Sequence, residues 1–84
     1  MEIHIIYTEG EMLLSRKPYS CWREIQEEYA DYQTSLGPWG EAEVIGYLRE
    51  QYPDLEPPAA QQVRSFAASG NVVQALSWQT RLLP

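Results

Sequence analysis

Two side chains in the sequence are of types that act in nucleophilic or metal chemistry, and each is the only one of its kind. His4 is the single histidine and Cys21 the single cysteine. They would form a catalytic dyad only if the N-terminal segment packed against the start of a helix that follows Ser20. We expect instead that Cys21 is a small buried thiol and that His4 lies at the solvent edge, because free cysteines are usually buried.

The remaining polar residues match no known catalytic pattern. With one histidine and one cysteine, a zinc site would depend mainly on carboxylates, which is uncommon. The five glycines match neither the phosphate-binding loop nor the dinucleotide fingerprint. Adjacent carboxylates such as Glu27 and Glu28 point to different sides of a helix and stay ionised on an open face. We therefore expect no enzyme activity, no catalytic residues, no metal and no cofactor.

Charge is distributed unevenly along the chain. The protein has 84 residues with 12 acidic and 6 basic side chains, which gives a formal net charge of −6. All 12 acidic residues lie within residues 1–56, whereas the only charged side chains in residues 57–84 are those of Arg64 and Arg81. This balance argues against a globally basic nucleic-acid binder and against adhesion to an anionic membrane surface.

Acidic and aromatic residues gather in the middle of the chain. Glu24, Glu28 and Asp31 recur at helical spacing, so neighbours in the row would lie about 5–6 Å apart and imitate a stretch of phosphate backbone. Tyrosine and tryptophan are enriched at protein interfaces. The predicted partner-binding residues are Glu24, Glu27, Glu28, Asp31, Tyr19, Trp39, Glu41 and Glu43.

This surface predicts a small non-enzymatic protein that binds a larger protein with a basic surface. Its most concrete form is an inhibitor of the DNA-mimic kind, which phages and other mobile elements direct against nucleic-acid-processing complexes such as CRISPR effectors. Charge would orient the encounter and aromatic anchors would hold the complex. No direct contact with nucleic acid is expected in this interpretation.

Two alternatives remain open. Helices over 41–52 and 58–69 would form a helix-turn-helix that reads duplex DNA through Gln61, Gln62 and Arg64, although the basic stripe typical of DNA binders is absent. The other alternative is a homodimeric structural module that uses Trp39 and Trp78 to complete its core. A gel shift with duplex DNA and sedimentation at two concentrations distinguish these alternatives from the inhibitor.

The first half of the chain predicts a hairpin followed by a long helix. Alternating apolar residues and the turn sequence at Glu9–Glu11 indicate a β-hairpin within residues 2–15. A helix is expected over 20–36, with Ser20 as its cap and Gly37 at its end. Its apolar face would consist of Trp22, Ile25, Tyr29, Tyr32 and Leu36.

The second half predicts helices over 41–52 and 58–69, and residues 72–83 favour a helix slightly over a strand. Together these elements predict an α+β fold, a helix-dominated single domain over residues 1–84 in which a short N-terminal β-hairpin packs on three or four α-helices. The N-terminus has no basic region or long apolar run, so we expect a cytoplasmic protein without a membrane partner.

Overall fold

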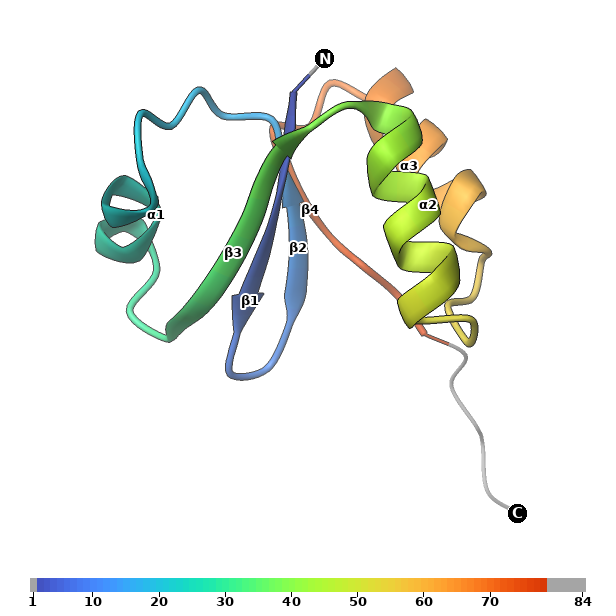
Figure 1. The fold of residues 1–84 in the computed structure, drawn as a ribbon, viewed down its shortest axis with the longest axis horizontal. Coiled ribbons are helices and arrows are strands. Elements are labelled where there is room, and N and C mark those ends of the chain that lie inside the picture. The colour runs from blue at the N-terminus through green and yellow to red at the C-terminus, as the bar shows by residue number, and fades with distance from the viewer. Residues whose placement is uncertain (1, 79–84) are drawn as a thin grey trace.

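The N-terminal hairpin forms as its alternating pattern predicts, and it lies at the centre of the fold. In the computed structural model, which describes residues 2–78, β1 (Ile3–Thr8) pairs antiparallel with β2 (Met12–Ser15). Successive side chains of a strand point to opposite faces, so Ile3 and Ile5 lie on one face and His4 and Ile6 on the other. All four are buried. Both faces of the hairpin are therefore covered by other elements (Figure 1).

Two further strands extend the hairpin into a four-stranded antiparallel sheet. β3 (Tyr32–Trp39) pairs with β1 and β4 (Val73–Ala75) pairs with β2, which gives the order β3-β1-β2-β4. Gly37 in β3 has a φ of +108°, and a Cβ atom there would lie 2.6 Å from the backbone oxygen of Ile3. This position therefore requires glycine, because an L side chain would be strained and would clash.

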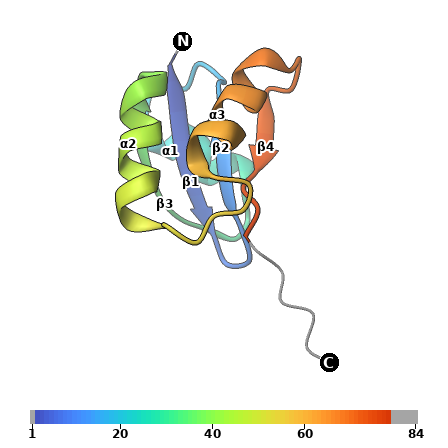
Figure 2. The same cartoon turned by 90° about the vertical axis from the view of Figure 1, so that its right-hand side faces the viewer.

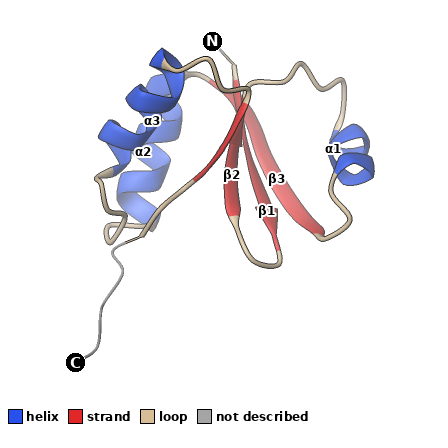
Figure 3. Ribbon diagram, turned by 180° about the vertical axis from the view of Figure 1, so that it is seen from behind, coloured by secondary structure: helices blue, strands red, loops and turns tan. Residues whose placement is uncertain are grey.

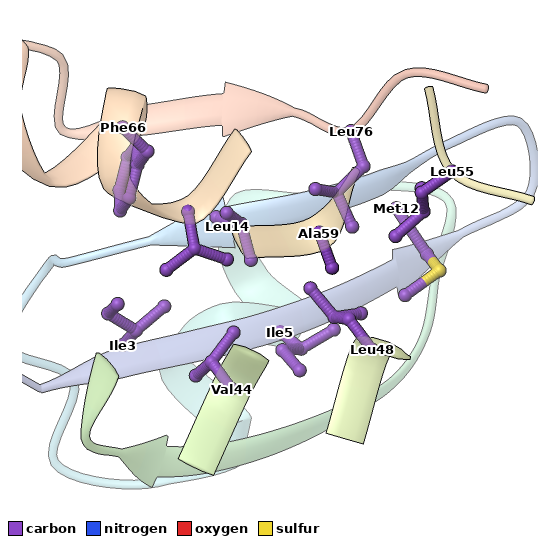
Figure 4. Close-up of a cluster of buried hydrophobic side chains, with 11 residues drawn as sticks. Ile3, Ile5, Met12, Leu14, Val44, Leu48, Leu55, Ala59, Phe66 and Leu76 are labelled. Carbon is purple, nitrogen blue, oxygen red and sulfur yellow. The ribbon is translucent and has the colours of Figure 1, made fainter. Parts of the chain in front are cut away.

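Helices α2 (Glu41–Gln51) and α3 (Ala59–Ala68) lie side by side on one face of the sheet (Figures 1 and 2). They confirm the helices predicted over 41–52 and 58–69. The carboxylate of Glu43 accepts a hydrogen bond of 3.1 Å from the Gly40 N–H and caps the start of α2. Figure 4 shows the main core between these helices and the sheet, formed by Ile3, Ile5, Met12, Leu14, Val44, Leu48, Leu55, Ala59, Val63, Phe66 and Leu76.

The opposite face of the sheet has a thinner cover. Helix α1 (Trp22–Glu28) lies there, away from α2 and α3 (Figure 3), and its only buried residue is Ile25. Ile25 joins a second apolar cluster with Ile6 and Leu13. Four partly buried residues pack against this cluster, namely Tyr19, Tyr29, Tyr32 and Val73.

The helix predicted over 20–36 is wrong. α1 spans only residues 22–28, and residues 32–39 form β3. Cys21, not Ser20, occupies the N-cap position, and no side chain caps this end. Tyrosine and threonine favour strands, and residues 32–39 gain antiparallel pairing with β1, interrupted by two register shifts, which outweighs the local helical spacing.

The predicted fold class is correct, but the predicted proportion of helix to sheet is wrong. The described residues 2–78 form an α+β fold with three helices, but the hairpin is part of a four-stranded sheet and the fold is not helix-dominated. In the last predicted element, Val73–Ala75 forms a strand that pairs with β2, so the helix favoured there is wrong for these residues. Residues 79–83 of that prediction lie outside the described part of the chain.

Candidate functional site

The structure separates the predicted partner-binding residues onto two sides of the sheet. Glu24, Glu27 and Glu28 belong to α1, whereas Glu41 and Glu43 belong to α2 on the opposite face (Figure 1). Trp39 lies at the end of β3 and packs on the α2 side, with its ring centroid 5.3 Å from that of Tyr47. The eight predicted residues therefore do not form one continuous surface.

The carboxylates near α1 do not form the regular row that a long helix would present. α1 ends at Glu28, and Asp31 lies in the turn that leads to β3. Glu28 is paired with the Lys17 Nζ at 2.8 Å, and it also accepts a hydrogen bond of 3.1 Å from the Tyr19 hydroxyl. The Glu24 carboxylate accepts the backbone N–H of Ser20 at 2.6 Å. Both Glu24 and Glu28 therefore already have contacts within the fold.

A different acidic surface forms where the β1–β2 turn meets the turn between α1 and β3. The Glu9 N–H donates to the backbone oxygen of Asp31 at 3.2 Å, which joins the two turns. Tyr29 follows the last residue of α1 and packs on the second apolar cluster, and burial, together with the negative charges of Glu28 and Glu11, raises its pKa. We call this surface the acidic end. It consists of Glu9, Glu11, Glu27, Glu28 and Asp31.

The acidic end has little compensating positive charge. Among residues 2–78, the ion pair between Lys17 and Glu28 is the only salt bridge. Glu27 and Glu28 also lie in the last turn of α1, which has no basic residue, and carboxylates are disfavoured there by the negative end of the helix dipole. Glu27, Glu28 and Asp31 are among the predicted partner-binding residues, whereas Glu9 and Glu11 are not. The acidic turn sequence at Glu9–Glu11 could have indicated them, although only the pairing of β1 with β3 brings this turn close to Asp31.

His4 and Cys21 exchange the environments that the sequence predicts for them. Cys21 is exposed, and His4 is buried with 7% of its surface accessible. The alternation in β1 explains this, because His4 lies on the second face of the sheet, which α1 and its flanking segment cover. The two residues line one hollow, so the N-terminal strand does lie beside the start of α1.

The His4 imidazole is buried without a polar partner. Neither ring nitrogen has a hydrogen-bond partner among the described residues. Burial lowers the pKa of His4, and the nearby negative charge of Glu2 opposes this only in part. The ring meets that of Tyr19 edge to face at 5.2 Å. The imidazole is therefore neutral at pH 7.

Trp22 also differs from its prediction, because it was expected in the core and is 54% exposed. It lines the same hollow as His4, and the Arg23 guanidinium lies 5.6 Å from the centre of its ring system. The exposed aromatic residue on α1 is Trp22, which was not among the predicted partner-binding residues. Trp39 is half-buried instead.

The residues proposed for DNA reading are only partly accessible. Gln61 and Arg64 are exposed, but Gln62 is 5% exposed. The Gln62 amide nitrogen donates to the backbone oxygens of Pro57 and Ser77 at 2.7 and 2.8 Å, and its oxygen accepts the Ser77 N–H at 2.9 Å. Gln62 therefore joins α3 to the segment after β4 and is not available to a base.

The tryptophans of the dimer alternative pack within their own chain. Trp39 contacts Tyr47, and the ring of Trp78 lies 6.1 Å from that of Tyr52. Between them, the Tyr7 hydroxyl meets those of Tyr47 and Tyr52 at 3.0 and 2.9 Å. Burial and these hydrogen bonds raise the pKa of Tyr7, so its phenol stays protonated. This aromatic group stabilises the junction between β1 and α2.

Within residues 2–78, no three side chains of the types histidine, cysteine, aspartate and glutamate come together as a metal site. None of the described helices has the length and apolar character needed to cross a membrane. No family model, no curated protein and no solved structure matches the chain. The function must therefore be inferred from the geometry and the charge of the molecule itself.

Proposed function

We propose that this protein is a small acidic interaction protein, without enzymatic activity, that binds a basic surface of a larger protein. The observation that supports this proposal is the acidic end. The backbone hydrogen bond from Glu9 to Asp31 joins the β1–β2 turn to the turn before β3, and both turns and the last turn of α1 carry carboxylates, with one lysine among the described residues to offset them.

Concentrated like charge is unfavourable for the free protein and favourable for meeting a cationic partner. The acidic residues repel one another, and the end of α1 adds its own negative dipole. A partner that supplies lysine or arginine side chains removes this repulsion. Its association with the acidic end is also faster and better oriented, since charge complementarity acts mainly on the association rate.

Trp22 supplies an anchor near this charge. It is the first residue of α1, about 8–9 Å along the helix axis from Glu27 and Glu28 in the last turn. Exposed tryptophans contribute strongly to binding when an interface buries them. A partner that covers α1 would contact Trp22 and the acidic end together.

The specific form that we favour is an inhibitor that occupies a basic groove of a nucleic-acid-processing complex. Mobile elements direct inhibitors of this kind against CRISPR effectors and other defence nucleases. Because α1 is short, the imitation of nucleic acid would depend on the density of negative charge and not on a row with the spacing of phosphates.

Two triple variants test this proposal with the same loss of charge. The first carries Glu9→Gln, Glu27→Gln and Asp31→Asn at the acidic end. The control carries Glu50→Gln, Asp54→Asn and Glu56→Gln, which are also exposed. Both are used, beside the wild type, to capture proteins from a host lysate at about 0.05 M and about 0.5 M salt.

We expect the wild type and the control variant to retain the same basic protein at low salt, and the acidic-end variant to retain at least about tenfold less, as a loss of 1.4 kcal/mol implies. High salt should release the protein from all three. Equal retention by the two variants, or retention that salt does not change, would show that the acidic end does not carry binding.

A further inference from the structure

The hollow between α1 and the sheet has no charged side chain in its walls. It has a volume of about 290 Å³ and lies between the start of α1 and the end of β3. Its walls consist of His4, Tyr19, Ser20, Cys21, Trp22, Ile25, Ser35, Leu36, Gly37 and Pro38. None of these is an acid, a lysine or an arginine, although the chain has a formal net charge of −6. We call this hollow the His4 pocket.

His4 gives the pocket an unused hydrogen-bonding group. Its side chain is more than nine-tenths buried, and neither ring nitrogen has a partner among the described residues. A buried polar group without a partner is unfavourable. Because the imidazole is neutral, it has one N–H donor and one nitrogen acceptor. A ligand with a polar edge in this pocket would satisfy one of them.

Tyr19 separates the His4 pocket from a second hollow. His4 and Tyr19 line both, and the second is completed by Glu2, Arg16, Lys17 and Pro18. Tyr19 belongs to a segment between β2 and α1 that has no regular secondary structure. A displacement of its ring would open His4 to a ligand without breaking a strand pair, but it would give up the hydrogen bond from the Tyr19 hydroxyl to Glu28.

The other walls favour a flat, apolar ligand. Trp22 is half-exposed beside the opening and offers the face or edge of an indole, while Leu36 and Ile25 supply apolar surface. A charged ligand would lose its hydration without gaining an ion pair, because the walls carry no opposite charge. The pocket is thus suited to an uncharged ring with one polar substituent.

We propose that the His4 pocket binds an uncharged planar aromatic molecule whose hydroxyl or N–H group donates a hydrogen bond to the His4 imidazole. The ring lies against Trp22, and Tyr19 moves aside to admit the polar edge. This inference does not depend on the proposed function, because no residue of the acidic end lines the pocket.

Three probes of similar shape separate the contributions to binding. p-Cresol has a flat ring and a hydroxyl donor, toluene lacks the hydroxyl, and 4-methylbenzoate replaces it with a negative charge. The chain contains one histidine and one cysteine, so each reports on the pocket without ambiguity. Binding is followed by the imidazole ¹⁵N and ¹H signals of His4 and by the rate at which iodoacetamide alkylates Cys21.

We expect p-cresol to shift the His4 signals saturably and to slow the alkylation of Cys21, with a dissociation constant of about 1 mM for so small a ligand. Toluene and 4-methylbenzoate should each bind about tenfold more weakly, because they lose the hydrogen bond or pay for a buried charge. Trp22→Ala, at an exposed position, should weaken p-cresol binding at least about fivefold. Val72→Ala, at an exposed position outside the pocket, is the matched control and should change nothing.

Three results would overturn the proposal. The first is a His4 spectrum that p-cresol leaves unchanged up to its solubility limit. The second is equal binding of p-cresol and toluene, which would show that His4 forms no hydrogen bond. The third is equal binding to the wild type and to Trp22→Ala.

Discussion

At the scale of single residues, His4 is the side chain with the least favourable surroundings. It is buried on the second face of the sheet with two unpaired ring nitrogens, and the titratable or charged residues that line the same two hollows are Glu2, Arg16, Lys17, Tyr19 and Cys21. Its pKa in the folded protein is lower than the usual value of 6.5, because burial disfavours the charged imidazolium. The unfolded chain therefore takes up a proton at a higher pH than the folded protein does.

This difference predicts how the free energy of unfolding depends on pH. The contribution of neutral His4 is fully present above about pH 7 and is lost as the pH falls through 6.5 towards the folded pKa, with a slope of at most about 1.4 kcal/mol per pH unit. Urea unfolding between about pH 7.5 and 5.5 measures it. His4→Leu should flatten the dependence in this range. An identical slope in the variant would contradict the assignment to His4.

At the scale of elements, Arg16 joins the end of β2 to the end of α3. Its Nε donates to the Asn71 oxygen at 2.8 Å, and an Nη donates to the oxygens of Phe66 and Ser69, each at 2.7 Å. The guanidinium also lies 4.8 Å from the centre of the Phe66 ring. α3 has no basic residue in its own last turn, so Arg16 supplies the cation that favours this helix end.

Arg16→Ala should lower the free energy of unfolding by about 1–3 kcal/mol, because it removes the donor to the carbonyl groups of Ser69 and Asn71. Arg16→Lys should recover only part of this, since a single ammonium nitrogen cannot occupy both positions from which Nε and Nη donate. Urea unfolding measures both. Arg64→Ala, at an exposed position on α3, is the control and should change stability by less than about 0.5 kcal/mol. Equal losses for Arg16→Ala and Arg64→Ala would contradict this role.

The elements that sequence predicts correctly are those whose signals are local. The alternation in the hairpin, the Glu43 cap of α2 and the prolines before α3 each act within a few residues, and all three elements form where expected. Residues 22–36 are different, because the predicted helix and the actual structure bring several of the same side chains together. Ile25, Tyr29 and Tyr32 do join one apolar cluster, but from a helix, its end and a strand.

The candidate site was predicted in part for the same reason. Glu27, Glu28 and Asp31 lie within five consecutive residues, so the local sequence is enough to identify them. Glu9 and Glu11 join them only through the pairing of β1 with β3, which is a contact between distant segments. The burial of His4 could not be read from its neighbours alone, since it depends on whether the second face of the sheet is covered.

At the scale of the whole molecule, negative charge is concentrated where the fold offers it little compensation. The acidic end combines like charges from three segments, and its effect on stability depends on ionic strength because these side chains are mostly exposed. Repulsion of this kind weakens the compact state. The protein therefore retains electrostatic repulsion at the acidic end, which neutralising these carboxylates would remove.

The triple variant Glu9→Gln, Glu27→Gln and Asp31→Asn should be more stable than the wild type by about 0.5–1 kcal/mol at low salt, and the gain should shrink as salt is added. Thermal unfolding at several salt concentrations measures this. The control variant Glu50→Gln, Asp54→Asn and Glu56→Gln should gain less. A stabilisation that is independent of salt, or equal in the two variants, would show that the acidic end holds no special repulsion.

The unequal covering of the two sheet faces has a consequence for how this chain can evolve. α2 and α3 place six buried residues, namely Val44, Leu48, Ala59, Gln62, Val63 and Phe66, against the sheet, whereas α1 places only Ile25. Most substitutions on α1 therefore remove little of what holds the chain together. Sequence changes in that layer are therefore tolerated more easily than changes in α2 and α3, which hold the main core together.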